Sequence, residues 1–315
     1  MDKSSESLSD LYRFLEIAEQ GSLTATAERL GISQSALTRS VQALEQAYGS
    51  GLLDRGKRGV RLTEPGQIFV ERAREMVNLH EATVRELTDF DADPGGRVRI
   101  GLPISTSRVF ATPLVALTAQ RHPRVTLAIT EDISENMEIG LSKGHLDLAI
   151  LVSPKTRRGK LHTSPIAAEQ LLVVTPPGHP LAERARLEWR DLAGQAIVAH
   201  PEGNFMRHWL TRMNGRHSLG VHLVAEANSR TLMVELVRAG IGVALMPGCS
   251  VTEELANGTV VGRPLDGMRI VWSVAYDGQR QPSGIVERVQ VLMQELAADL
   301  ARQGIWTPVA AASPR

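Results

Sequence analysis

The feature that most constrains the fold is an alternation of strand and helix patterns that begins after residue 97. Short runs rich in β-branched and aliphatic residues recur at 97–102, 125–130, 146–151, 171–175, 196–200, 221–226, 242–247 and 269–276. Helical patterns separate most of these runs, which is typical of mostly parallel sheets covered by helices. The alternation fills about 200 of the 315 residues. This is more than one small sheet needs, so we expect two α/β lobes.

The first 63 residues carry a different pattern, made of short helices joined by tight turns. Apolar residues over 8–18 follow helical spacing. Ser22 is a suitable N-cap for a second helix over 23–30, and Gly31 is suited to end it. Ser33 then caps a third helix. Two helices joined by a short glycine-containing turn predict a helix-turn-helix.

The third predicted helix has an apolar stripe and an opposite polar face. The stripe consists of Leu37, Val41 and Leu44, at i, i+4 and i+7. The polar face carries Gln34, Ser35, Thr38, Arg39 and Gln42. Glutamine and arginine can make bidentate contacts with adenine and guanine, and hydroxyls can bond to bases or phosphate. Any surface helix has a polar face, so a solvated face is the alternative interpretation.

Positive charge is concentrated around this helix. Residues 29–61 contain six basic and two acidic residues, a local net charge of +4, although the whole chain has a net charge of +0. The segment LLDRGKRGVRLT (52–63) combines glycines, basic residues and alternating apolar positions, which predicts a β-hairpin or wing. A recognition helix beside a basic wing is suited to contact DNA phosphates.

A fourth helical pattern begins at Thr63 and continues to about Phe90. Seven positions repeat with the alternating 4-3 spacing of paired helices: Phe69, Ala73, Met76, His80, Thr83, Leu87 and Phe90. The seam is imperfect, since His80 and Thr83 are polar. An amphipathic helix lying on its own domain is the alternative; we expect pairing between two copies, because few residues precede this helix. Residues 91–96, DADPGG, predict a linker.

Residues 8–66 resemble the N-terminal domain of LysR-type transcriptional regulators. The matching motifs are A-E-x-G-S, A-x-x-L-x-x-S-Q-x-A-L-[ST]-R, L-E and L-x-x-R-x-x-x-G-V-x-L-T-x-x-G, with the spacing of the family throughout. GRVRIGLPIS, G-x-L-D-L-A-I (144–150) and LVRAGIGVALMP (236–247) extend the resemblance along the chain. Ser35 stands where proline is common, and Leu53 where phenylalanine is usual.

The resemblance implies roles for individual residues of the helix-turn-helix and the wing. Gln34, Ser35, Thr38 and Arg39 would read the major groove, and Ser33 would be both N-cap and phosphate donor. Arg55 and Arg58 match wing positions that reach the DNA backbone or the minor groove. The predicted DNA-binding residues are Ser33, Gln34, Ser35, Thr38, Arg39, Gln42, Arg55 and Arg58.

The resemblance also implies the domain organisation of an α+β multidomain protein. It would have an N-terminal winged helix-turn-helix, a long linker helix and a C-terminal two-lobed α/β effector domain similar to periplasmic binding proteins. We expect the DNA-binding domain at 1–64, the linker and dimerisation helix at 65–93, the effector domain at 94–305, and a disordered tail at 306–315. Lobe I would comprise about 97–164 and 268–303, and lobe II about 165–267.

A hydroxyl-rich strand-to-helix turn follows the first predicted strand, at PISTSR (103–108), and similar polar turns recur at HPEGNF (200–205) and NSRT (228–231). Ligands bind outside the carboxyl ends of parallel strands, where helix N-termini offer N–H groups to anions. The predicted effector-binding residues are Ser105, Thr106, Ser107, His200, Asn204, Ser229, Arg230 and Thr231. They favour a small anionic metabolite, although helix capping explains each hydroxyl equally well.

Several other classes of protein fit the sequence poorly. Hydrophobic residues make up 43% and charged residues 22%, a globular composition. The single cysteine, Cys249, rules out an intramolecular disulfide and a cysteine-based metal cluster within one chain. The histidines lack metal-ligand spacing, and GLLDRGKR and GIGVAL lack key residues of the phosphate and dinucleotide motifs. We therefore expect no enzyme activity, no metal and no cofactor.

We predict a sequence-specific DNA-binding transcriptional regulator that a small-molecule effector controls. The alternatives are a small-molecule binding protein or an α/β enzyme with a helical dimerisation appendage. The predicted partners are double-stranded operator DNA, the effector, further copies of the chain as a dimer or tetramer, and RNA polymerase. The polar start, MDKSSESLSD, and the lack of long apolar runs predict a cytoplasmic protein without membrane contact. The effector, the operator, the target genes and the sense of regulation stay open.

Overall fold

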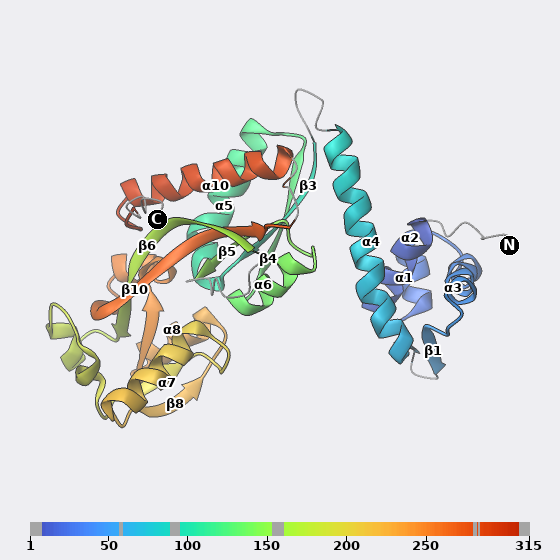
Figure 1. The fold of residues 1–315 in the computed structure, drawn as a ribbon. Coiled ribbons are helices and arrows are strands. Elements are labelled where there is room, and N and C mark those ends of the chain that lie inside the picture. Colours follow the sequence, from blue (N-terminus) through green and yellow to red (C-terminus); the bar gives the residue numbers. More distant parts are fainter. Residues whose placement is uncertain are drawn as a thin grey trace. The chain divides into compact units, whose positions relative to one another are not determined.

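The computed structural model describes residues 8–56, 59–88, 95–152, 161–279, 282 and 284–308. The chain divides into two compact units, and each is described by itself. Figure 1 shows the first unit around α1 to α4 and the second around the long strands β6 and β10. No helix of the described part combines the length and the apolar character that a bilayer-spanning segment requires.

The first unit is a helix-turn-helix with a two-stranded wing, as predicted. Its elements are α1 (Leu8–Gln20), α2 (Leu23–Leu30), α3 (Gln34–Tyr48), β1 (Leu53–Gly56), β2 (Gly59–Leu62) and α4 (Glu64–Thr88). The strands β1 and β2 pair antiparallel, with Leu53 opposite Leu62. Apolar side chains from α1, α2, α3 and α4 form one core, to which the wing contributes Leu53.

Caps and a left-handed glycine set the turn between α2 and α3. Ser22 Oγ accepts a hydrogen bond from Ala25 N at 3.3 Å, and Ser33 Oγ accepts one from Ala36 N at 3.2 Å. Gly31 ends α2 with φ 65°, a conformation that costs glycine little. These local interactions explain why the two helices separate where the sequence predicted.

The wing is attached to α3 through the glutamate of the L-E motif. Glu45 Oε1 accepts from the backbone N–H groups of Leu52 at 2.8 Å and Leu53 at 3.2 Å. Gly66 lies so close to the same segment that an added Cβ would come within 2.0 Å of the Leu52 carbonyl oxygen. The motif residues Glu45 and Gly66 therefore fix the start of the wing from two sides.

The first part of the predicted pairing seam on α4 belongs to the core of its own unit. Ala73 is fully buried, and the Phe69 ring lies 5.1 Å from the Phe14 ring in an edge-to-face contact. The prediction that Phe69 and Ala73 pair with a second copy is therefore wrong, because these side chains cover α1. Phe90 and the predicted linker up to residue 94 lie outside the described residues.

The second unit is built on one eight-stranded sheet with two lobes. Its strands are β3 (Gly96–Leu102), β4 (Val125–Glu131), β5 (Leu148–Val152), β6 (Leu161–Thr175), β7 (Ala196–Ala199), β8 (His222–Glu226), β9 (Val243–Pro247) and β10 (Val261–Asp277). Their order is β4-β3-β5-β10-β6-β9-β7-β8. In lobe I, β3 is parallel to β4 and β5; in lobe II, β7 is parallel to β8 and β9.

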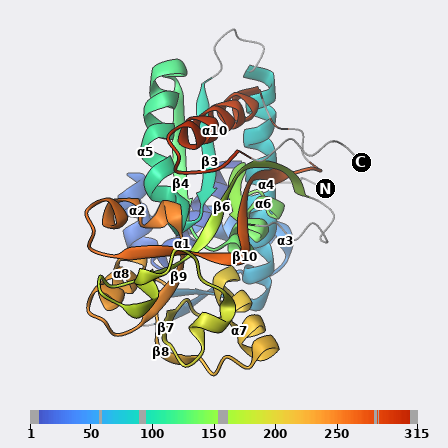
Figure 2. The same ribbon diagram turned by 90° about the vertical axis from the view of Figure 1, so that its left-hand side faces the viewer.

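Helices cover both lobes, and two long strands connect them. The helices are α5 (Ile104–Arg121), α6 (Ser134–Ser142), α7 (Phe205–His217), α8 (Arg230–Arg238), α9 (Thr252–Ala256) and α10 (Gly284–Arg302). Strands β6 and β10 pair with each other antiparallel; β10 also pairs with β5 of lobe I, and β6 with β9 of lobe II. Figure 2 shows the two strands side by side between the lobes. Both are longer than the sequence predicted.

A buried carboxyl group lies where the connecting strands meet lobe II. Glu169 on β6 is 5% exposed, and its Oε1 accepts from Trp272 Nε1 on β10 at 2.6 Å. Its Oε2 accepts from the backbone N–H of Cys249 at 2.9 Å. The Cys249 thiol in turn donates to the Ser105 carbonyl oxygen at the start of α5, at 3.4 Å. Glu169 therefore links both connecting strands to the segment after β9.

The predicted disordered tail at 306–315 is wrong at its start. Trp306 is 3% exposed and stacks on Trp272 and Phe110, with ring centroids 6.3 and 5.7 Å away. Thr307 forms an antiparallel bridge with Ala168. An indole buries a large apolar area, which outweighs the entropy of an ordered terminus. Residues 309–315 lie outside the described part.

Replacing Glu169 by Gln is expected to change how stability depends on pH. Burial raises the pKa of Glu169 above its ordinary value of 4.5, so the folded state binds this proton more tightly than the unfolded state. The wild type should therefore lose free energy of unfolding relative to Glu169→Gln as pH rises from about 4.5 through the raised pKa, by up to about 1.4 kcal/mol per pH unit.

Urea unfolding at a series of pH values, followed by tryptophan fluorescence, measures this difference, because all four tryptophans lie in the second unit. Glu287→Gln is the matched control, since Glu287 is exposed on α10. A difference between wild type and Glu169→Gln that stays constant with pH would mean that Glu169 does not titrate as described.

Candidate functional site

The polar face of α3 points away from the hydrophobic core of the first unit. Leu37, Val41 and Leu44 are fully buried and hold the helix to the core. On the other face, Thr38 is half-buried. The remaining predicted DNA-binding residues of this segment are exposed: Ser33, Gln34, Ser35, Arg39 and Gln42. The periodic stripe predicted from the sequence therefore does separate core from surface on this helix.

An arginine on α1 fixes the position of α3 from behind. Arg13 Nη1 donates to Ser40 Oγ at 2.8 Å and to Asp10 Oδ1 at 3.2 Å. Ser40 is buried at the back of α3. Sequence reasoning did not find this contact, because the two residues are separated by 27 positions and no local pattern signals it. A helix held in this way keeps its exposed face in one orientation, which specific groove recognition requires.

The wing lies beside the helix-turn-helix and carries exposed positive charge. Val60 N donates to the Gly21 carbonyl oxygen at 3.0 Å, and an added Cβ at Gly59 would come within 2.8 Å of the same oxygen. Arg61 on β2 is exposed. The Arg55 side chain and the whole of Arg58 lie outside the described residues, so their predicted phosphate contacts stay predictions.

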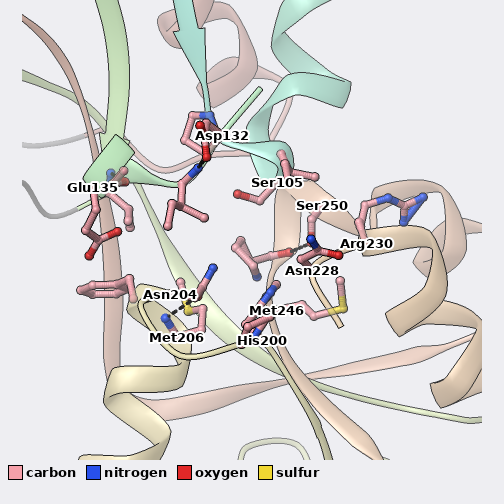
Figure 3. Close-up of a pocket in the computed structure, with 18 of the residues that line it drawn as sticks. Ser105, Asp132, Glu135, His200, Asn204, Met206, Asn228, Arg230, Met246 and Ser250 are labelled. Atoms are coloured by element: carbon pink, nitrogen blue, oxygen red, sulfur yellow. Dashed lines mark hydrogen bonds between the residues drawn. The ribbon is translucent and has the colours of Figure 1, made fainter. Parts of the chain in front are cut away.

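The second unit contains a cavity of about 320 Å³ between its lobes, a size suited to a small molecule. Its walls come from the segments that follow β3, β4, β7 and β9, at the carboxyl ends of strands, as expected for parallel sheets. Figure 3 shows Ser105 and Asp132 on the side of lobe I, opposite Asn204 and His200 of lobe II. The floor includes the buried Trp272 of β10.

Half of the predicted effector-binding residues line this cavity. Ser105, His200, Asn204 and Arg230 do so. The prediction is wrong for the other four, which are Thr106, Ser107, Ser229 and Thr231. The hydroxyl groups of these four residues lie outside the cavity lining.

The physical reason for these four errors is helix geometry. Thr106 is fully buried and bonds to the Pro103 carbonyl oxygen at 3.1 Å, and the Ser107 hydroxyl bonds to Glu131. Ser229 caps α8 through Leu232 N at 3.3 Å. Thr231 is exposed. Successive helical residues point in different directions, so a run of hydroxyls cannot all face one cavity.

The cavity has polar lining residues that the sequence reasoning did not single out: Asp132, Glu135, Asn136, Glu202, Asn228 and Ser250. Asp132 and Glu135 follow β4, and Asn228 follows β8. Ligands bind outside the carboxyl ends of parallel strands, so examining the end of every predicted strand points to these residues. The sequence prediction named Ser229, Arg230 and Thr231 of the turn at 228–231 but not Asn228, and it did not include the segment after β4.

The single arginine among the described lining residues is engaged by a glutamate. Arg230 Nη1 and Nη2 donate to Glu254 Oε1 at 3.0 and 2.8 Å, and Figure 3 shows this side chain extending away from the middle of the cavity. Burial lowers the pKa of His200 from 6.5 to about 4, so its imidazole is neutral at pH 7. The lining charges described here therefore disfavour the anionic effector that the sequence predicted.

The described residues contain no group of three or more His, Cys, Asp or Glu side chains arranged to hold a metal ion. The polar groups that line the cavity are carboxylates, amides, serine hydroxyls, a neutral imidazole and the guanidinium of Arg230. Such groups can bind and orient a small molecule by hydrogen bonding.

Two family models match the chain. The one described as bacterial regulatory helix-turn-helix protein, lysR family, matches residues 8–67, which cover the helix-turn-helix and the wing. The one described as LysR substrate binding domain matches residues 91–301, which cover both lobes of the second unit.

Similar proteins agree with these models. A probable hydrogen peroxide-inducible genes activator of Streptomyces viridosporus is 30% identical over 301 residues, which are 93% of this chain and 95% of that protein. A full-length OxyR variant from Pseudomonas aeruginosa is 20% identical with a TM-score of 0.72, covering 98% of this chain and 99% of that one. CbnR complexed with its target DNA is 20% identical with a TM-score of 0.68, covering 93% and 99%. With its helix-turn-helix, its effector cleft and both family models in agreement, the chain belongs to the LysR family of DNA-binding transcriptional regulators.

Proposed function

We propose that α3 reads an operator in the major groove, that the wing contacts the DNA backbone, and that a small effector in the cleft changes this binding. The observation that carries the proposal is the exposed face of α3, where Gln34 and Arg39 lie opposite a fully buried stripe. Both residue types can make bidentate contacts with base edges. A cytoplasmic location and the domain boundaries predicted from the sequence, apart from the start of the tail at Trp306, belong to this proposal.

Peroxide sensing by a thiol is not part of the proposal, although relatives are named for induction by hydrogen peroxide. Cys249 is the one cysteine of the chain and is fully buried. Burial raises the pKa of its thiol well above the ordinary value, and the thiolate is the reactive species. The cavity therefore supports a bound effector better than a redox reaction at Cys249.

Replacing Gln34 or Arg39 by Ala should leave the fold intact and weaken operator binding by about 1–3 kcal/mol each, if each makes a bidentate base contact. The operator is first selected by the wild-type chain from random DNA, and affinities are then measured by fluorescence anisotropy. Gln294→Ala, at an exposed position of α10, is the control. Equal preference for operator over random DNA in wild type and both variants would reject the assignment.

Replacing Arg55 or Arg58 by Ala should weaken specific and nonspecific DNA binding alike. Removing one phosphate contact should reduce the slope of log affinity against log salt by about one unit. Arg72→Ala is the matched control, because Arg72 is exposed on α4 and pairs with Glu75 at 2.8 Å. A salt slope equal to that of the wild type would show that these residues do not contact phosphate.

We propose that the chain dimerises through the exposed apolar stripe of α4, and that tetramers and RNA polymerase contacts follow as in the family. This stripe consists of Ile68, Met76 and Leu79, which are 64%, 37% and 69% exposed. Isolated exposed apolar residues are common, but three on one face of a long helix suit pairing.

Leu79→Glu and Met76→Glu should therefore dissociate the dimer while the helical content stays unchanged. Ala73→Glu should instead unfold the first unit, because Ala73 is fully buried in its core. Sedimentation and circular dichroism separate the two outcomes, with Gln67→Glu as the exposed control away from the stripe. An unaltered sedimentation coefficient for Leu79→Glu would place the contact elsewhere.

A further inference from the structure

The charges that line the cavity of the second unit indicate which chemical class of effector it binds. This inference rests on the function proposed above, in which the cavity holds the effector. Three carboxylates line the cavity: Asp132 and Glu135 of lobe I, and Glu202 of lobe II. Among the described lining residues, Arg230 is the one arginine or lysine, and Glu254 offsets its charge at 2.8 Å. The described wall therefore carries net negative charge on both lobes.

Two of these carboxylates have no partner within the described protein. Glu135 in the first turn of α6 is half-buried, and Glu202 in the turn before α7 is exposed; neither forms a hydrogen bond or ion pair with a described residue. Asp132 is only partly engaged, since its Oδ1 accepts from Ile133 N at 2.7 Å and from Asn136 Nδ2 at 2.9 Å. Carboxylate oxygens that face a cavity without donors are suited to a ligand that supplies the donors.

The positions of the three carboxylates strengthen this interpretation. Asp132 and Glu135 belong to one lobe and Glu202 to the other, so a cation between them is attracted by both lobes. A cleft lined by charge of one sign also raises the local concentration of ligands of the opposite sign. The lining also includes apolar side chains, among them Ile133, Phe205 and Trp272, which lower the local dielectric constant and strengthen such attraction.

We propose that the effector carries a protonated amine, which binds between the carboxylates of Asp132, Glu135 and Glu202. An ammonium group offers three N–H donors and a positive charge, which suits Glu135 and Glu202, whose carboxylates have no donor among the described residues, and the partly engaged Asp132. A ligand bearing only carboxylates meets like charge in this cavity and is disfavoured.

Amino acids and diamines both supply such an amine, and the start of α5 distinguishes them. This helix begins after Pro103 without a side-chain cap, and the amide groups of Ile104 and Ser105 have no acceptor among the described residues. The Ser105 hydroxyl lines the same cavity. An amino acid has a carboxylate that can accept from these groups, whereas a diamine has none.

The test is a thermal-shift and calorimetric screen of the full-length chain. The probes are the proteinogenic amino acids, linear diamines, and linear mono- and dicarboxylates of matched length. We expect stabilisation by amine-bearing compounds only, since a ligand that binds the folded state raises its stability. Glu135→Gln and Glu202→Gln should each raise the Kd of the amine by about ten- to hundredfold, and Glu287→Gln should leave it unchanged.

The screen separates amino acids from diamines as the source of the amine. It also separates a failure of this proposal from a failure of the proposed DNA-binding function. Ser105→Ala should weaken binding of an amino acid but not of a diamine. Binding by carboxylates without an amine, or amine binding that Glu135→Gln and Glu202→Gln do not change, overturns the proposal. Binding by no probe also overturns it. Operator binding, measured with the α3 variants, is independent of these outcomes and tests the proposed function separately.

Discussion

The antiparallel pairing of β6 with β10 is the constraint on which the effector domain depends. These two strands bring together the three parallel strands of each lobe in one sheet, and the cavity lies where the lobes meet. Because β10 pairs with β5 and β6 pairs with β9, neither lobe completes its sheet without a strand that also belongs to the other. A change in the angle between the lobes must therefore pass through these strands.

Glu169 connects the two strands to the rest of the junction by hydrogen bonds. Its carboxyl group bonds to the indole of Trp272 on the partner strand and to the backbone of Cys249 after β9. Trp272 and Ser105, which are reached through this set of contacts, both line the cavity. A buried polar group that is fully hydrogen-bonded favours one arrangement of the groups around it. The floor of the cleft is accordingly held by polar bonds as well as by packing.

Local signals in the sequence predicted much of this structure, and long-range contacts account for the rest. Ser22, Gly31 and Ser33 act within a few residues, so their patterns predicted the ends of α2 and α3. Contacts such as Arg13 with Ser40 join distant segments, and no periodicity signals them. The same limit explains why the prediction of a disordered tail is wrong at Trp306, whose contacts with Phe110 and Trp272 join distant segments.

The site divides along the same line. The exposed face of α3 follows from helical periodicity alone, whereas the lining of the cavity depends on how seven segments meet. Polar side chains in the turns after the strands located the cavity through Ser105 and Asn204, but they did not indicate its charge. That charge depends on which carboxylates have no donor within the described part of the chain, as is true of Glu135, and which are engaged, as Glu254 is by Arg230.

The central claim is that the cleft and the recognition helix are thermodynamically coupled. The most direct measurement is a linkage experiment on the full-length chain: operator affinity with and without saturating effector, and effector affinity with and without saturating operator. Linkage requires both ratios to equal the same factor, and allosteric coupling typically makes it about 5- to 150-fold. A factor of one in both arms, with each ligand still bound, would contradict the account.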